Sequence, residues 1–290
     1  MNDLLLHEST RAQLNQFAVQ PSHAVALLAP TGAGKRTIAL HLAARLLNNT
    51  LEKLQNYPYF RIYTPEKSTI SIEAVRDITS FTKLKTTGKN PIRRVVVIEN
   101  AEAMTVEAQN ALLKTLEEPP EDTVFILTVT DISCLLSTVQ SRLQTVSVLQ
   151  TDQTKTINYF LTKGYDQNSV QQYYFMSSGL PGLMHALLSE NQDHPLVQSI
   201  QKAKTILKSD CFERLVAIEE IVKNKQAEAI VSAICTISRS AMYIEAEREN
   251  SKEAVIKRWA KILQAAEEAK QLLTQNTQSK LVLTSLFLHI

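Results

Sequence analysis

Residues 29–37 read APTGAGKRT and directly follow AVALL, a short apolar run at 24–28. The run is too short for a helix, so it predicts a buried strand. After the loop, apolar residues recur every four positions, which predicts a helix over 37–48. Strand, glycine-containing loop and helix in this order form the setting of a phosphate-binding P-loop, in which backbone N–H groups point at phosphate oxygens.

The loop keeps the frame of a nucleotide site but departs from it at one position. Gly32 and Gly34 permit the tight turn, and Lys35 is placed to reach the β and γ phosphates. The next residue is Arg36, where an active site has a hydroxyl for magnesium, and a guanidinium has no lone pair for a metal. Thr37 sits one residue late, so its side chain points about 100° away around the helix.

A second motif, VVVIENAE at 95–102, resembles the strand that supplies the carboxylates of such a site. Its β-branched start predicts a strand buried on both faces of a parallel sheet. Glu99 takes the magnesium position, whereas Asn100 takes the position that polarises water, and an amide cannot accept a proton. Glu102 is close in sequence, but its side chain projects from a position two residues further along. We therefore expect it to lie too far away to polarise the water. We therefore expect no intrinsic ATPase activity.

The remaining pattern predicts a doubly wound parallel α/β domain over 1–150, because strands alternate with helices. After residue 150 no further strand is expected. Short helices predict a small helical lid over 151–196, and long helices predict an all-α domain over 197–290. The expected strands are 24–28, 60–63, 95–98, 124–130 and 146–149; the expected helices are 8–20, 37–48, 72–84, 105–117, 154–162, 167–176, 181–188, 197–208, 211–223, 225–248, 252–274 and 278–289.

Composition narrows the class of protein. A net charge of +2 over 290 residues gives no global attraction to nucleic acid, so any DNA contact has to be local. We find no signal peptide and no apolar stretch near the ~18 residues of a membrane span, which predicts a cytoplasmic protein without membrane contact. The three cysteines, Cys134, Cys211 and Cys235, are too few for a disulfide framework, and we expect them to be small buried hydrophobes.

Two further features each have alternatives. A basic cluster precedes residues 95–98 and either contacts DNA phosphates or is a solvated loop; the absence of interleaved aromatic residues favours the loop. In the last long helices, Trp259, Ile262 and Leu263 are anchors of a subunit interface or members of an internal core. The basic cluster consists of Lys83, Lys85, Lys89, Arg93 and Arg94.

Longer stretches carry a family resemblance. ENAEAMTVEAQNALLKTLEEPPEDTVFILTVTD at 99–131, followed by LLSTVQSRLQTV at 135–146, resembles the AAA+ clamp-loader family of bacterial DNA polymerase III. Residues 110–120 match the family's NALLKxLEEPP block without a gap. PSHAVALLAPTGAGKRT at 21–37 and NTQSKLVLTSLFL at 276–288 extend the resemblance over almost the whole chain. GKRT after the loop glycine is common in the family's non-motor subunits and uncommon in its motors.

The resemblance implies an AAA+ P-loop domain, a helical lid and a helical collar through which five subunits form an open ring. ATP on the motor subunits drives the ring to open the sliding clamp and close it around primed DNA. This chain then resembles a non-hydrolysing stator in a DNA-directed DNA polymerase complex whose nucleotidyltransferase activity lies in other subunits. The implied partners are motor gamma/tau-like and delta-like subunits, the sliding clamp and primed DNA.

The resemblance also implies roles for residues. Arg142, in Ser-Arg-Leu where the family has Ser-Arg-Cys, maps to an arginine finger that acts on a neighbour's ATP; without the resemblance, a surface ion pair is the ordinary interpretation. Thr130 maps to the position that senses the phosphate. The degenerate nucleotide site thus comprises Gly32, Ala33, Gly34, Lys35, Arg36, Thr37, Glu99 and Thr130.

Departures from the family pattern bear on cofactors. Residues 47–60 lack the four-cysteine zinc module of many relatives, so we expect no zinc and no other metal. Gly182 stands near the place where motors have a lid arginine, which favours the stator. ATP or ADP either binds without hydrolysis or the loop is kept only as architecture. The alternatives are an active gamma/tau-like ATPase motor, an ATP-binding DNA-repair protein and an ATP-binding regulator.

Overall fold

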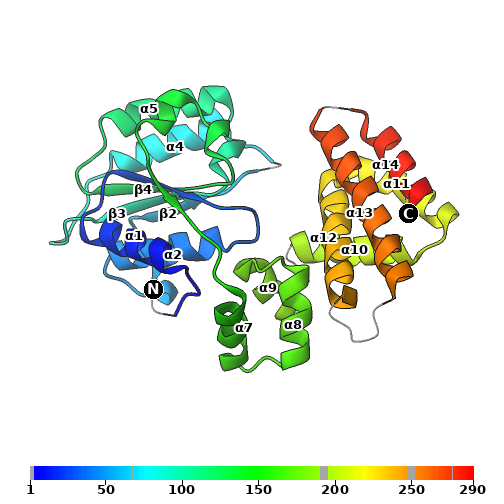
Figure 1. The fold of residues 1–290 in the computed structure, drawn as a ribbon. Helices are drawn as coiled ribbons and strands as arrows, with labels where there is room; N and C mark the ends of the chain where they lie inside the picture. Colours follow the sequence, from blue (N-terminus) through cyan, green and yellow to red (C-terminus); the bar gives the residue numbers. More distant parts are fainter. Residues whose placement is uncertain (1–2, 67, 190–194, 247–251, 276) are drawn as a thin grey trace. The chain divides into compact units, whose positions relative to one another are not determined.

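The computed structural model describes residues 3–66, 68–189, 195–246, 252–275 and 277–290. The chain divides into two compact units, Met1–Thr151 and Asp152–Ile290 (Figure 1). The division falls one residue after the predicted end of the α/β domain. A further boundary near residue 197, between lid and collar, stays a prediction.

The first unit is an α/β domain. Its described residues form one parallel five-stranded sheet in the order β2-β3-β4-β1-β5. The elements are α1 (Glu8–Val19), β1 (Ala24–Leu28), α2 (Lys35–Leu46), α3 (Leu51–Leu54), β2 (Phe60–Tyr63), α4 (Ile72–Thr82), β3 (Arg94–Ile98), α5 (Val106–Glu117), β4 (Thr123–Val129), α6 (Ser137–Gln140) and β5 (Gln144–Ser147). The predicted fold class, a P-loop α/β domain followed by helices, is confirmed.

The central strands β3 and β4 are buried along their whole length, as their continuous apolar sequence predicts. Successive side chains of a strand point to opposite faces, so each strand supplies two cores. Val95 and Val97 pack with the residues of α1 and α2, whereas Val96 and Ile98 pack with those of α4 and α5. Figure 1 shows these helix pairs covering the two faces of the sheet.

Several element boundaries differ from the predicted ranges by one or two residues, and two of the differences have clear local reasons. Helix α2 begins at Lys35 rather than residue 37, because Gly34 adopts a left-handed conformation and caps the helix. Strand β5 ends at Ser147 rather than residue 149, because its pairing with β1 runs only to the end of that strand, where Leu28 meets Ser147. The apolar residue that suggested the later end, Leu149, is 46% exposed.

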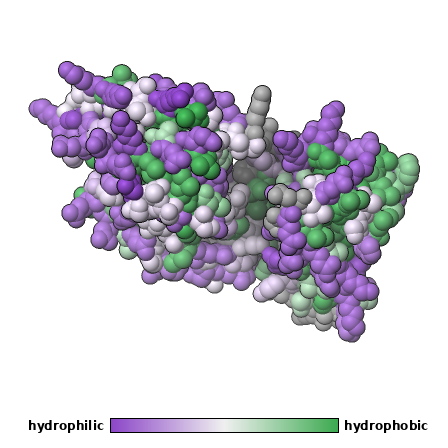
Figure 2. Space-filling view, turned by 90° about the horizontal axis from the view of Figure 1, so that it is seen from above, coloured by the Kyte–Doolittle hydropathy of each residue, from purple (hydrophilic) through white to green (hydrophobic). Residues whose placement is uncertain are grey.

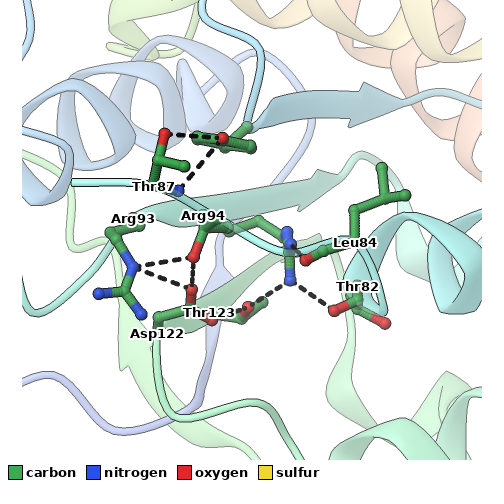
Figure 3. A network of polar contacts seen from close by, with 9 residues as sticks. Thr82, Leu84, Thr87, Arg93, Arg94, Asp122 and Thr123 are labelled. Carbon is green, nitrogen blue, oxygen red and sulfur yellow. Dashed lines mark hydrogen bonds and ion pairs between the residues drawn. The ribbon is translucent and has the colours of Figure 1, made fainter.

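A buried arginine lies at the amino end of the inner strand β3. Arg94, the first residue of β3, is 1% exposed. Its guanidinium donates hydrogen bonds to the Thr82 and Leu84 carbonyls and to the Thr123 hydroxyl, the last at 3.2 Å (Figure 3). The guanidinium carbon lies 5.2 Å from the centre of the Phe81 ring. One side chain thereby ties the end of α4 to strands β3 and β4.

The basic cluster is therefore not a uniform surface feature. Arg94 is buried, and Arg93 donates to Asp122 at 3.2 Å and to the Thr86 hydroxyl at 2.8 Å (Figure 3). The prediction that all five basic residues form one loop surface is wrong for Arg94, because loop carbonyls surround its guanidinium. The three lysines of the cluster, Lys83, Lys85 and Lys89, are exposed.

In the described residues of the second unit, helices joined by short turns are the only regular structure. Its elements are α7 (Gln153–Thr162), α8 (Gln167–Met176), α9 (Pro181–Leu188), α10 (Pro195–Lys208), α11 (Cys211–Lys223), α12 (Ala227–Ala246), α13 (Glu253–Thr274) and α14 (Ser279–His289). The described part of the chain has no helix long and apolar enough to cross a membrane.

The core of the second unit is built around α12, whose apolar stripe includes fully buried Ile230 and Ile234. Ile262 of α13 is 4% exposed, and Trp259 and Leu263 pack partly buried against the same core. Ile262 is therefore part of the internal core, and Trp259 and Leu263 contribute to the same core from partly buried positions; a role of these residues in a subunit interface stays a prediction. Hydrophobic residues also reach the surface of this unit (Figure 2). The most exposed large ones lie on α11 and α14: Phe212, Val216, Leu281 and Leu288.

The cysteines differ from the expectation that all three are buried. Cys235 of α12 is buried, and burial raises the pKa of its thiol above the ordinary value. Cys134 in the first unit and Cys211 in the second are exposed. Cys134 belongs to a short 3-10 helix and Cys211 begins α11, so neither side chain faces a core.

Candidate functional site

The loop after β1 keeps the backbone shape of a phosphate cradle. Gly32 and Gly34 have φ angles of 92° and 86°, a left-handed conformation that residues with a Cβ rarely adopt. The Ala33 N–H donates to the Pro30 carbonyl at 3.2 Å, which closes the turn. Gly34 then starts α2, so the positive end of that helix dipole faces the loop.

The Lys35 ammonium makes hydrogen bonds to other groups of this chain. The residue is 7% exposed, and its ammonium donates to the Ala29 carbonyl at the start of the loop and to the Thr130 hydroxyl at 3.3 Å. Burial lowers the pKa of Lys35, and the nearby Glu102 carboxylate opposes that shift. The lysine that reaches phosphates in an active P-loop instead links the loop to the end of β4.

Arg36 forms an ion pair with Glu99, the carboxylate that was predicted to hold magnesium. Its guanidinium lies 2.7 Å from Oε2 of Glu99, in an ion pair whose Glu99 side chain is 10% exposed. Burial raises the pKa of Glu99, and the charge and hydrogen bond of Arg36 lower it in opposition. The other oxygen of Glu99 is buried and has no hydrogen-bond partner among the described residues. The ion pair connects two predicted site residues that are 63 positions apart in the chain.

The chain beyond β3 turns back toward the sheet. Asn100 has a φ angle of 48°, a left-handed conformation that asparagine tolerates better than most residues, and its N–H donates to the Thr128 hydroxyl at 2.9 Å. The turn brings Glu102 back to the end of β4, where its Oε1 accepts a hydrogen bond from the Thr130 N–H at 3.1 Å. The expectation that Glu102 lies out of reach is wrong, because it assumes an extended chain after the strand.

The structure thus brings most of the predicted nucleotide site together at the carboxyl ends of β1, β3 and β4. Open α/β sheets bind ligands at this edge. Thr37 is the exception: it is exposed and makes no side-chain hydrogen bond among the described residues. Glu102 is the member that sequence reasoning missed. An acidic residue shortly after a buried strand was the available signal, and the left-handed Asn100 was the missing information.

Arg142 lies apart from this cluster, between α6 and β5. Its guanidinium forms an ion pair with Oε1 of Glu117 at 2.6 Å and donates to the Thr138 carbonyl at 2.8 Å and to the Ser141 hydroxyl at 3.2 Å. The side chain is 32% exposed. These contacts match the ordinary interpretation, a surface ion pair. They also hold the guanidinium in one place on the surface of the first unit.

Comparison with known proteins agrees with this fold. The family model described as DNA polymerase III, delta subunit, matches residues 8–152, which is half of the chain. A gamma subunit-related DNA polymerase III protein from Thermotoga maritima has a TM-score of 0.52 at 17% identity, covering 97% of this chain and 98% of that one. At that identity, the likeness shows the fold alone.

Several curated relatives share the name DNA polymerase III subunit delta'. DNA polymerase III subunit delta' of Pseudomonas aeruginosa is 39% identical over 139 residues, which cover 42% of each chain. The Yersinia pestis subunit of that name is 44% identical over 89 residues, 30% of this chain and 26% of that one. The chain thus matches less than half of the length of these relatives. Together, the P-loop fold, the family match and these relatives place the chain in the DNA polymerase III delta-subunit family, in its delta' branch.

Proposed function

We propose that this chain is a non-hydrolysing clamp-loader subunit that completes a neighbouring subunit's ATP site while a sliding clamp is loaded onto primed DNA. The observation that carries the first half of the proposal is the ion pair between Arg36 and Glu99. Magnesium in a P-loop site is held by a hydroxyl after the lysine and by a carboxylate after the neighbouring strand. Here, an arginine replaces the hydroxyl and binds the carboxylate.

The loop fits a phosphate but does not fit a magnesium nucleotide. Left-handed Gly32 and Gly34 leave the backbone N–H groups arranged for an anion. A magnesium ion would have to displace the Arg36 guanidinium from Glu99 and would find no hydroxyl beside it. Asn100 adds no base to activate water. We therefore derive no hydrolytic step for this site, and the motor alternative has no observation in its favour.

Calorimetry with ATP tests this description of the site. We expect the chain to bind ATP no more tightly with magnesium than without it. In the Arg36→Thr variant, Glu99 is freed and a hydroxyl is supplied, so magnesium is expected to tighten ATP binding by about tenfold, which corresponds to about 1.4 kcal/mol. Thr37→Ala is the matched control on the same helix turn and should leave ATP binding unchanged. Magnesium-dependent binding to the unmodified chain would contradict the proposal.

The second half of the proposal assigns Arg142 to the neighbour's ATP. An arginine offered across a subunit boundary neutralises the charge that develops on the transferred phosphoryl group. In support, the Arg142 guanidinium is partly exposed and held at its far end by Glu117, which leaves its position defined. Release from Glu117 toward a triphosphate is electrostatically downhill, because the triphosphate carries more negative charge than one carboxylate.

An assembly role is further supported by the apolar side chains on α11 and α14. Phe212 is 75% exposed and Leu281 is 63% exposed on two helices that contact each other, and exposed apolar residues that lie together mark interaction surfaces. We propose that these helices bind other loader subunits.

Reconstitution tests the function as a whole. The chain is mixed with clamp-loader motor and delta-like subunits, and clamp- and DNA-stimulated ATP hydrolysis is measured with and without it. We expect the chain to co-purify with the motors and to raise their hydrolysis rate while hydrolysing no ATP alone. Steady ATP turnover by the purified chain, or a complex equally active without it, would overturn the proposal.

A further inference from the structure

The loop that joins α4 to β3, residues 83–93, is strongly basic. Residues 83–94 contain five lysine and arginine residues and no aspartate or glutamate. The loop precedes β3, and in a parallel sheet the amino ends of the strands share one edge. The P-loop follows β1 and therefore lies at the opposite edge, where the strands end. A ligand of the basic loop would thus bind apart from the nucleotide site.

Hydrogen bonds attach this loop to the sheet (Figure 3). Asp122, which precedes β4, accepts hydrogen bonds from the Thr86 hydroxyl and, at 3.2 Å, from the Arg93 guanidinium. The hydroxyl of Tyr59, which precedes β2, lies 3.1 Å from the Thr87 hydroxyl and accepts the Thr87 N–H at 3.2 Å. The loop is thus joined to the segments before two strands, so its side chains extend from a supported backbone.

The lysines of the loop are available to an anion. Lys83, Lys85 and Lys89 are exposed, and none of them makes an ion pair or a side-chain hydrogen bond among the described residues. The Asp122 carboxylate that contacts the loop is already paired with Arg93. Like charges on one short loop repel one another, and a ligand with several negative charges relieves that repulsion. Phosphates spaced along a polynucleotide are such a ligand.

The fold supplies the aromatic residue that the sequence of the loop lacks. Tyr59 is partly exposed, and its two bonds to Thr87 place its ring beside the loop. The ring of Tyr57 packs edge-on against it, with ring centres 5.9 Å apart and planes 81° apart, which orients the Tyr59 ring. Lysines for phosphates beside a ring on which a base can stack are the combination typical of proteins that bind single strands.

From these features we infer that residues 83–93 and Tyr59 bind a single strand of nucleic acid, whose phosphates contact the three lysines and one of whose bases stacks on the tyrosine. A duplex keeps its bases stacked on one another, so it cannot use the ring. An acidic peptide would use the lysines and leave the ring without a partner. This site goes beyond the proposed function, because the roles proposed for Arg142 and the P-loop stand whether or not this loop binds a strand.

Fluorescence anisotropy of a dye-labelled oligothymidylate of about twelve nucleotides, titrated with the full chain at rising salt, tests the inference. We expect saturable binding at low salt. The logarithm of the binding constant should fall with the logarithm of the salt concentration with a slope of about −2, because three phosphate contacts each contribute about −0.7. Unlabelled duplex of the same length and oligoglutamate should displace the labelled strand less well than unlabelled oligothymidylate. No binding at low salt, or equal displacement by either competitor, would overturn the inference.

Variants separate the phosphate contacts from the base contact. Lys85→Gln should reduce the magnitude of the salt slope by about 0.7, whereas Lys261→Gln, which removes an exposed lysine of α13, is the control and should leave the slope unchanged. Equal slopes in these two variants would count against the site.

Tyr59→Leu should weaken binding about fivefold or more and leave the slope unchanged, because it removes a stacking platform and no charge. Tyr59→Phe keeps the ring but loses the hydroxyl bonds to Thr87, and it should bind nearly as well as the unmodified chain. Equal losses in the two variants would overturn the stacking contact, since the tyrosine would then act only through its hydroxyl. Circular dichroism checks that each variant is folded.

Discussion

Replacing Arg142 with alanine is expected to slow ATP hydrolysis at the site completed by this chain by about a thousandfold or more, the usual contribution of an arginine finger. The fold of the chain should be unaffected. The ion pair with Glu117 is partly exposed on both sides, with side-chain exposures of 32% and 49%, and such pairs contribute about 0–1 kcal/mol. The effect should therefore appear in the assembled loader and not in the stability of the isolated chain.

Pre-steady-state phosphate release by the reconstituted complex measures this effect best, because the other ATP sites keep working and mask it in the steady state. The burst should lose the amplitude of one site. Arg142→Lys should show nearly the same loss, since an ammonium lacks the planar fork of a guanidinium. Glu117→Gln tests positioning: it keeps the finger and weakens only its support, so the burst should remain but slow down. An unchanged burst in Arg142→Ala would remove the finger from the mechanism.

Replacing Arg94 with alanine is expected to destabilise the first unit by about 2–6 kcal/mol. The buried Thr82 carbonyl loses its donor, and an unpaired buried polar group costs about 1–3 kcal/mol, while the partly buried Leu84 carbonyl loses a second bond. The vacated space beside Phe81 adds a cavity. Arg94→Lys should recover only part of the loss, because one ammonium cannot reproduce the spread of the guanidinium donors.

Amide hydrogen exchange followed by mass spectrometry suits this measurement, because a chain of two units need not unfold in one step. Exchange of the β3 and β4 amides should accelerate in Arg94→Ala, while the helices of the second unit keep their protection. Lys85→Ala, an exposed member of the same basic cluster, is the control and should leave exchange unchanged. Unaltered protection of β3 in Arg94→Ala would mean that the amino ends of β3 and β4 do not depend on this residue.

Much of the first unit was predictable because its strands are buried on both faces. A continuous apolar run such as Val95–Ile98 is typical of a strand that is buried on both faces in the centre of a parallel sheet. The glycines of the loop and the capping residue Thr105 then set where two helices begin; Thr105 accepts the Ala108 N–H as expected. Local signals of this kind act over a few residues, so the sequence displays them directly.

The remaining features depend on contacts between distant residues. The ion pair of Arg36 with Glu99 and the bond of Lys35 to Thr130 form only after three strands have aligned their ends. The burial of Arg94 is similar: in sequence it is one of five basic residues, and only the path of the loop around it distinguishes it from exposed Lys89. Sequence pattern predicted most of the residues that gather near the P-loop, with Thr37 apart and Glu102 missed, but not which of them bind one another.

The distribution of the thiols has a practical consequence. One cysteine is exposed in each unit, Cys134 in the first and Cys211 in the second, while Cys235 is protected by burial and by its raised pKa. Maleimide dyes can thus be attached as a donor and acceptor pair without engineering a single residue. Energy transfer between the two dyes then reports the distance between the two units while loader subunits, clamp and DNA are added.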